Sequence, residues 1–171
     1  MRPNVRNITL PWGNEDTQQL IDILAKYKVK ATFFVVGEWV DKYSESVKAL
    51  ADAGHEVMSH SNTHAHFNSL SAQEIIDDLN ACGDKIEAVT GVRPTLFRCP
   101  YGEYDDHVIN TVRSLGLEPI QWDVERSHTA SSSWSARNSG ICNGKGNGSR
   151  IRELFLFLAR HFSHRPAGIN P

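Results

Sequence analysis

Disulfide-forming cysteine pairs and an excess of charge of either sign are both missing from this sequence. The 171 residues contain three cysteines, Cys82, Cys99 and Cys142, and an odd, widely spaced set argues against a disulfide framework and against a Cys-x-x-Cys metal site. The formal net charge is −2, so electrostatics gives no reason to propose nucleic acid or an anionic membrane surface as a partner. The charge therefore gives no support to a nucleic-acid-binding or membrane-binding function.

Long hydrophobic runs are also missing. No apolar run approaches the roughly 18 residues that a membrane-spanning helix needs. The N-terminus lacks the basic, apolar and small-residue series that is typical of a signal peptide. We therefore predict neither a membrane span nor a signal peptide, and the sequence leaves the location of the protein open.

What is present is an alternation of strand-like and helix-like segments in a chain of ordinary composition, 40% hydrophobic and 22% charged. Helices of this length between strands imply parallel pairing with right-handed crossovers, hence an α/β barrel or an open doubly wound sheet. The expected strands are residues 5–10, 31–36, 56–59, 95–98 and 118–124. The first expected helix is capped by Asn14 or Asp16 and carries the apolar residues from Leu20 to Tyr27. Three further helices are expected over residues 44–53, 71–90 and 106–115, and the one over 71–90 begins with a capping box of Ser71 and Glu74.

The texture of the sequence changes after Glu125. Residues 126–152 are rich in Ser, Asn, Gly and Arg, and such a stretch offers few apolar anchors to offset the entropy of the chain. We therefore divide the chain into a βα domain over residues 1–125 and an atypical, loosely ordered tail over residues 126–171.

Two clusters suggest chemistry because each lies where an expected strand hands over to a loop, the place where α/β folds build their sites. In the first, His60 and His64 stand four residues apart and can both reach one divalent ion. Taken alone, the same pattern fits ordinary core or surface histidines equally well. Two imidazoles also leave a catalytic zinc site short of its usual three protein ligands.

The second cluster is Arg98-Cys99-Pro100-Tyr101-Gly102. One interpretation is an exposed arginine beside a β-turn with a buried cysteine. The other is that Arg98 orients a carboxylate, while the turn offers a backbone N–H to a developing oxyanion.

Together the two clusters resemble the polysaccharide deacetylase family, the NodB-homology or carbohydrate esterase 4 domain. His60-Ser61-Asn62-Thr63-His64 is similar to its H-[ST]-x-x-H motif, and Arg98 to Gly102 is similar to its R-x-P-[YW]-G groove motif. The flanking Ala31-Thr32-Phe33-Phe34 and Gly54-His55-Glu56 resemble segments of the same family. The resemblance extends from about Asn7 to Val124.

The resemblance implies an incomplete, distorted (β/α) barrel and a hydrolase of carbon–nitrogen bonds other than peptide bonds. It implies a divalent metal ion, zinc being the expected one, and N-acetylated polysaccharides or oligosaccharides, chitin-like or peptidoglycan-like, as substrates. By position, His60 and His64 would hold the metal, Arg98 would orient the base, and the Tyr101 N–H would serve the oxyanion. Pro100, Tyr101 and Gly102 would contact the substrate. Members of this family are often extracytoplasmic.

The sequence departs from the family pattern at two places. The family's Thr-Phe-Asp-Asp motif should end the first strand, but the chain reads Thr9-Leu10-Pro11-Trp12 there, without an aspartate. Glu15 and Asp16 lie nearby, and their simpler interpretation is as carboxylates at a helix N-terminus. The Asp-x-x-x-Trp motif expected after the last strand is not recognisable in residues 125–129.

These departures predict an altered or truncated copy of a longer enzyme, with hydrolysis impaired in the sequence as written. The alternative from another functional class is a non-catalytic sugar-binding or metal-binding remnant. A full set of acid and base groups near the histidines would favour the enzyme, and their absence would favour the remnant.

Overall fold

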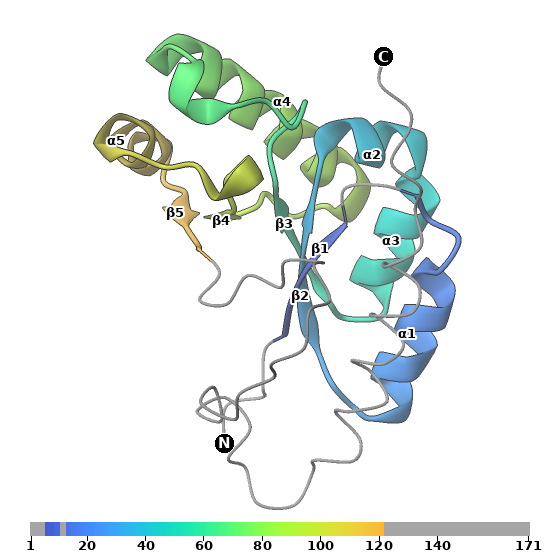
Figure 1. Cartoon of the computed structure of the whole chain (residues 1–171). Helices are drawn as coiled ribbons and strands as arrows, with labels where there is room; N and C mark the ends of the chain where they lie inside the picture. The colour runs from blue at the N-terminus through green and yellow to red at the C-terminus, as the bar shows by residue number, and fades with distance from the viewer. Residues whose placement is uncertain (1–5, 11–12, 122–171) are drawn as a thin grey trace, which may run out of the picture. The chain divides into compact units, whose positions relative to one another are not determined.

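The computed structural model describes residues 6–10 and 13–121, which form five strands and the helices between them (Figure 1). The strands are β1 (Arg6–Leu10), β2 (Ala31–Val35), β3 (Glu56–Ser59), β4 (Leu96–Phe97) and β5 (Glu118–Pro119). The α-helices are α1 (Thr17–Lys26), α2 (Gly37–Lys42), α3 (Ser44–Asp52), α4 (Ala72–Thr90) and α5 (Asp106–Ser114). Two short 3-10 helices, η1 (Phe67–Ser69) and η2 (Pro100–Gly102), follow β3 and β4.

All five strands are parallel and lie in the order in which they occur in the chain, β1-β2-β3-β4-β5. Within the described residues β1 pairs only with β2 and β5 only with β4, so this part of the sheet has two edges and does not close. The sequence prediction of an incomplete (β/α) barrel is thereby confirmed.

The helices pack against one another as well as on the sheet. α1 packs on α3, α3 packs on α2 and α4, and α4 packs on β3 and α5. Figure 1 shows α1, α2 and α3 together on one side of β1 and β2. The five residues of β2 are all buried, as expected for a parallel strand within an α/β sheet. Beneath α4 and α5 lies a second cluster of buried side chains: Phe67, Ile75, Leu79, Phe97, Cys99, Val108 and Val112.

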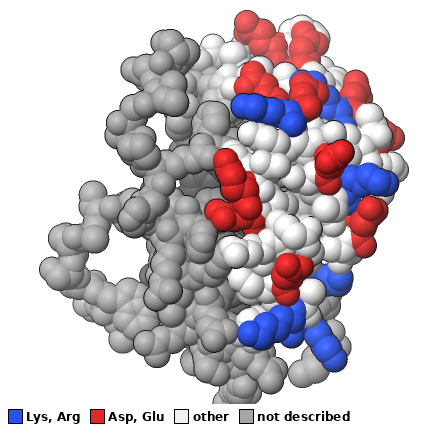
Figure 2. All heavy atoms as spheres, turned by 90° about the vertical axis from the view of Figure 1, so that its right-hand side faces the viewer, with Lys and Arg blue, Asp and Glu red and all other residues white. Residues whose placement is uncertain are grey.

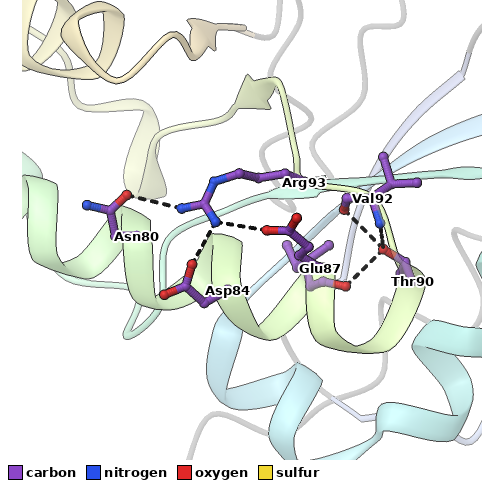
Figure 3. A network of polar contacts seen from close by, with 7 residues as sticks. Asn80, Asp84, Glu87, Thr90, Val92 and Arg93 are labelled. Carbon is purple, nitrogen blue, oxygen red and sulfur yellow. Dashed lines mark hydrogen bonds and ion pairs between the residues drawn. The ribbon is translucent and has the colours of Figure 1, made fainter.

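Helix α4 has defined polar contacts at both ends. At its start the Ser71 hydroxyl accepts from the Glu74 N–H while the Glu74 carboxylate accepts from the Ser71 N–H, which confirms the predicted capping box. At its end Gly91 takes the left-handed conformation, with φ 74°. Beyond it, Arg93 turns back along the helix and donates to Asp84, Glu87 and Asn80 (Figure 3).

The structure corrects the sequence prediction at the first helix. Asp16 is the N-cap residue of α1, but its side chain makes no capping hydrogen bond. Asn14 does not cap the helix with its side chain either, since its Nδ2 donates to the Ser46 hydroxyl at 3.2 Å. The cap is left to the backbone, where the Thr17 N–H donates to the Asn14 carbonyl.

Three further differences concern element length. Helix α2 was not predicted; it begins at Gly37, directly after the expected strand over residues 31–36. β4 is limited to Leu96–Phe97 instead of residues 95–98, and β5 to Glu118–Pro119. The expected continuation of the last strand over residues 122–124 and the expected tail over residues 126–171 lie outside the described residues, so the division of the chain at residue 125 stays a prediction.

Charged side chains on the described surface are of mixed sign. Figure 2 shows Lys and Arg interleaved with Asp and Glu on the face that lies to the right in Figure 1. Ion pairs of this kind join Lys48 to Asp52 and Lys85 to Asp41. None of the helices in residues 6–10 and 13–121 combines the length and the hydropathy needed to cross a membrane.

Candidate active site at the strand ends

The structure brings His60, His64, Arg98 and Tyr101 together at the carboxyl ends of neighbouring strands. His60 directly follows β3 and Arg98 directly follows β4, and these two strands pair in parallel through Ser59 and Phe97. Both side chains are buried, with 3% of His60 and 4% of Arg98 exposed. The predicted clustering of these four residues is therefore confirmed, while their chemical roles stay predictions.

His60 is held in one orientation by the backbone of the next strand. Its Nδ1 lies 2.7 Å from the Arg98 carbonyl oxygen. A carbonyl oxygen can only accept, so Nδ1 carries the proton and Nε2 carries the lone pair of the neutral ring. Burial lowers the pKa of His60 to about 4, although the carbonyl contact acts in the opposite direction. Neutral imidazole is the form that binds a metal ion.

His64 reaches the same place from a tight loop. Its backbone is left-handed, with φ 58°, and its N–H donates to the Ser61 hydroxyl at 2.9 Å. The centroids of the His60 and His64 rings are 5.1 Å apart and the rings meet edge to face. Burial also lowers the pKa of His64. The structure therefore places two imidazole rings in contact, and burial favours the neutral form of both.

The predicted groove segment forms η2, which packs against the histidine loop. Pro100 is buried, whereas 56% of Tyr101 is exposed. Both Tyr101 and Gly102 have left-handed backbones, with φ 57° and 68°. The Tyr101 ring lies 4.7 Å from the His64 ring, and the Gln121 side chain donates to the Gly102 carbonyl. The exposed Tyr101 ring thus forms a wall beside the histidine pair.

Two residues of this wall were not among the sequence candidates. The His66 ring stacks on Tyr101 with the centroids 4.0 Å apart and the planes within 8°. The Nδ1 of His66 contacts the Glu103 carboxylate at 2.8 Å. Their position just beyond each motif was the available signal, but no spacing rule connects His66 with Glu103, which are 37 residues apart in the chain.

Arg98 points across the site toward the end of β1. Its Nη1 donates to the Thr9 hydroxyl at 3.2 Å, and the guanidinium lies over the Phe34 ring at 4.1 Å. Burial lowers the pKa of Arg98. The arginine therefore points toward the carboxyl end of β1. The sequence continues there with Pro11 and Trp12, at the positions where the family resemblance implies two aspartates.

The described residues do not complete a catalytic metal site. His60 and His64 supply two nitrogen ligands, whereas catalytic zinc usually has three protein ligands and a water. Within residues 6–10 and 13–121, no three side chains of His, Cys, Asp or Glu are grouped so that they could hold an ion. Burial raises the pKa of Cys99 to about 12 and that of Cys82 to about 11, so both thiols stay protonated near neutral pH. We assign no catalytic step to a metal ion on this donor set.

Comparison with protein families agrees with this geometry. A family model described as polysaccharide deacetylase matches residues 8–120. Relatives include the peptidoglycan-N-acetylmuramic acid deacetylase PdaC of Bacillus subtilis, 34% identical over 158 residues that cover 87% of this chain and 32% of that protein. Chitin deacetylase 1 of Cryptococcus neoformans var. grubii is 31% identical and covers 81% of this chain and 30% of that protein. The chain thus spans about a third of the length of these relatives.

Solved structures of the same family share the fold. A CE4 family pseudoenzyme from Bacillus anthracis superposes with a TM-score of 0.66 at 36% identity, covering 71% of this chain and 44% of that one. A mutant of that pseudoenzyme with restored enzymatic activity superposes with a TM-score of 0.65 at 37% identity, covering 71% of this chain and 46% of that one. The two motifs at adjacent strand ends, the family model and the structural neighbours all point to one family. The chain therefore belongs to the polysaccharide deacetylase family.

Proposed function

We propose that this chain is a deacetylase-type domain that engages N-acetylated amino-sugar polymers and hydrolyses them at an impaired rate. One observation carries the proposal: a pair of neutral histidines and a buried arginine stand at the strand ends, but the sequence has Pro11 and Trp12 where the family pattern has two aspartates. Without these carboxylates the part of the site that the structure describes lacks a base and a third metal ligand. Loss of general-base catalysis alone typically costs about 10²–10⁴-fold in rate.

The relatives support the substrate class. The related proteins are deacetylases of peptidoglycan and of chitin, both of which are polymers with N-acetylated sugars. Pro100, Tyr101 and Gly102 would contact such a chain, because the exposed Tyr101 ring offers a flat surface beside the histidines. We assign no nucleic-acid or membrane partner.

His60 and His64 would hold a divalent ion, zinc in the first instance, and hold it weakly. The Nε2 lone pair of His60 is the group that would coordinate, because Nδ1 is engaged by the Arg98 carbonyl. Arg98 would orient an incoming carboxylate, and the Tyr101 N–H would face the developing oxyanion. These roles follow from the family resemblance together with the positions of the side chains.

A second candidate is a non-catalytic sugar-binding or metal-binding domain. The observation that favours it is the similarity to a protein described as a CE4 family pseudoenzyme. A mutant of that protein has restored enzymatic activity, so in that case the fold was kept although the activity had been lost. The two candidates differ only in whether acetate is released.

The test follows acetate release from N-acetylglucosamine oligomers in added zinc, with three proteins compared. They are the chain as it is, the double variant Pro11→Asp and Trp12→Asp, and His60→Ala in the unmodified chain. We expect little or no acetate from the unmodified chain and a gain of at least tenfold from the double variant.

Robust release by the unmodified chain that His60→Ala abolishes would contradict the impaired function. It would mean that another carboxylate, with Glu15 and Asp16 as the first candidates, supplies the missing role. If the oligomers bind, as monitored by changes in chemical shifts, but no acetate is released, the non-catalytic domain would be favoured.

A further inference from the structure

The histidine loop is attached to helix α4 through one carboxylate. The Asp78 Oδ1 accepts from the Asn62 N–H at 2.7 Å, and Oδ2 accepts from the Thr63 N–H at 3.2 Å and from the Thr63 hydroxyl at 2.9 Å. Asn62 and Thr63 lie inside the loop that begins at His60 and ends at His64. Three hydrogen bonds to a carboxylate thus converge on this loop, and each is of the stronger, charge-assisted kind.

The loop needs such support because its backbone is unfavourable on its own. Ser61 and His64 have φ values of 77° and 58°, in the left-handed region that residues other than glycine seldom adopt. Strained conformations of this kind persist only where surrounding contacts determine them. The left-handed turn at His64 is also what brings its ring to that of His60.

The opposite side of the loop rests on helix α2. The Gly37 N–H donates to the Ser61 carbonyl at 2.9 Å and the Glu38 N–H donates to the Asn62 carbonyl at 3.1 Å. Lys85 lies about two turns after Asp78 on α4. It donates to the Asn62 side chain and pairs with Asp41 of α2. The loop is therefore fixed between two helices, and α4 contributes the acceptor for its N–H groups.

We propose that Asp78 is a positioning residue for the His60–His64 pair. Its carboxylate fixes the peptide groups of Asn62 and Thr63, and these set the turn that places the His64 ring against His60 and Tyr101. These contacts of Asp78 go to the backbone of Asn62 and Thr63 and to the Thr63 hydroxyl, so through them it acts on the conformation of the loop. The inference stands on the geometry of the loop and does not depend on whether the chain hydrolyses a substrate.

The experiment compares Asp78→Asn with the matched control Asp77→Asn on the same helix. Asp77 is exposed and its side chain accepts from Gln73, away from the loop. In Asp78→Asn an NH2 group replaces one of the two carboxylate oxygens. This group cannot accept a hydrogen bond from the loop, so at least one of the three hydrogen bonds is lost. Asp78→Glu restores the carboxylate on a longer stem and serves as the rescue.

The main measurement is the set of nuclear Overhauser cross-peaks between the rings of His60, His64 and Tyr101, on samples well below their melting temperatures. We expect Asp78→Asn to lose the cross-peaks of His64, Asp77→Asn to keep them, and Asp78→Glu to recover them in part. We also expect zinc affinity to fall at least tenfold in Asp78→Asn and to stay within twofold in Asp77→Asn.

Unchanged ring cross-peaks in folded Asp78→Asn would overturn the proposal. Should that variant fail to fold, Thr63→Val, which removes only the hydroxyl contact, is the milder test: shifted His64 resonances would support the proposal and wild-type resonances would refute it. Absence of zinc binding by the unmodified chain would count against the metal site in the proposed function, but the cross-peaks would still decide the role of Asp78.

Discussion

Gly37 is the residue at which helix α2 and the histidine loop come closest. A Cβ atom added there would lie 2.3 Å from the Asn62 Oδ1 and 3.1 Å from the Asn62 Cα. The side-chain oxygen can move, but the backbone of Asn62 is held by Asp78 on its other side. The position therefore requires glycine for lack of space rather than for an unusual φ.

We predict that Gly37→Ala destabilises the fold by about 1–3 kcal/mol, the usual cost of forcing extra volume into a packed site. The measurement is the free energy of unfolding in urea. A variant as stable as the wild type would show that the loop can move away from α2 at little cost.

Gly83 offers the opposite case within α4. An added Cβ would meet the Arg93 guanidinium at 3.4 Å or more, an ordinary van der Waals distance. Alanine also lowers the entropy of the unfolded chain and is the better helix former. We predict that Gly83→Ala stabilises the protein by about 0.4–1 kcal/mol, measured by the same urea titration; a loss of stability would mean that Arg93 cannot give way.

The site could be predicted from single residues only in part. His60, His64, Arg98 and Tyr101 stood out because each belongs to a motif that ends an expected strand. His66, Glu103 and Asp78 did not, since an isolated histidine or carboxylate carries no local signal. Their contacts arise only when β3, β4 and α4 are packed side by side, and sequence spacing does not encode that packing.

The start of α4 is the best-defined helix end among the described elements. The Ser71 hydroxyl accepts from the Glu74 N–H, and loss of such a cap typically costs about 1 kcal/mol. We predict a loss of this size for Ser71→Ala, measured as a shift in the urea midpoint with an unchanged slope. Ser69→Ala is a suitable control, because the Ser69 hydroxyl donates to the His66 carbonyl outside the helix.

The same capping box should make stability depend on pH. The hydrogen bonds from the Ser71 hydroxyl and N–H lower the pKa of Glu74 below its usual 4.5. A carboxylate with a lowered folded pKa stabilises the fold above its unfolded pKa, and that contribution is lost as the pH falls through the folded pKa. We predict that the stability difference between the wild type and Glu74→Gln is constant near pH 7 and shrinks as the pH falls below about 4.5; a difference that does not shrink on acidification would contradict this.

Among the elements, those with strong local signals were predicted well. Helix α4 has an apolar stripe, a capping box and a glycine stop, and its bounds differ from the prediction by one residue. Helix α2 was missed because it has six residues and begins with glycine. Tertiary contacts stabilise it instead, including the Trp39 indole N–H, which donates to the Gly13 carbonyl at 2.7 Å. The predicted side-chain cap of α1 was wrong: Asp16 makes no capping hydrogen bond, and the Asn14 side chain donates to Ser46 of α3.

For the whole molecule, zinc should affect stability only slightly. A ligand that binds the folded state stabilises it by RT ln(1 + [L]/Kd), about 0.4 kcal/mol when its concentration equals Kd. Two imidazole ligands give weak binding, so we predict a melting temperature that rises by less than about 2 °C in submillimolar zinc.

The double variant Pro11→Asp and Trp12→Asp should show a larger rise in melting temperature in the same titration, and His60→Ala should show none. A large rise for the unmodified chain that survives in His60→Ala would place the bound zinc elsewhere in the protein.

The strand order has a consequence for how the domain forms. Within the described residues each strand pairs with the one synthesised just before it, so every ladder joins two strands that are separated by a single connection, as with Arg6 and Ala31 or Ser59 and Phe97. During synthesis each new βα unit can dock on a sheet edge already exposed at the ribosome, and β4 has β3 as its template before β5 has been made. The described part of the sheet can therefore grow one strand at a time, and the Arg98 carbonyl that orients His60 arrives only with β4.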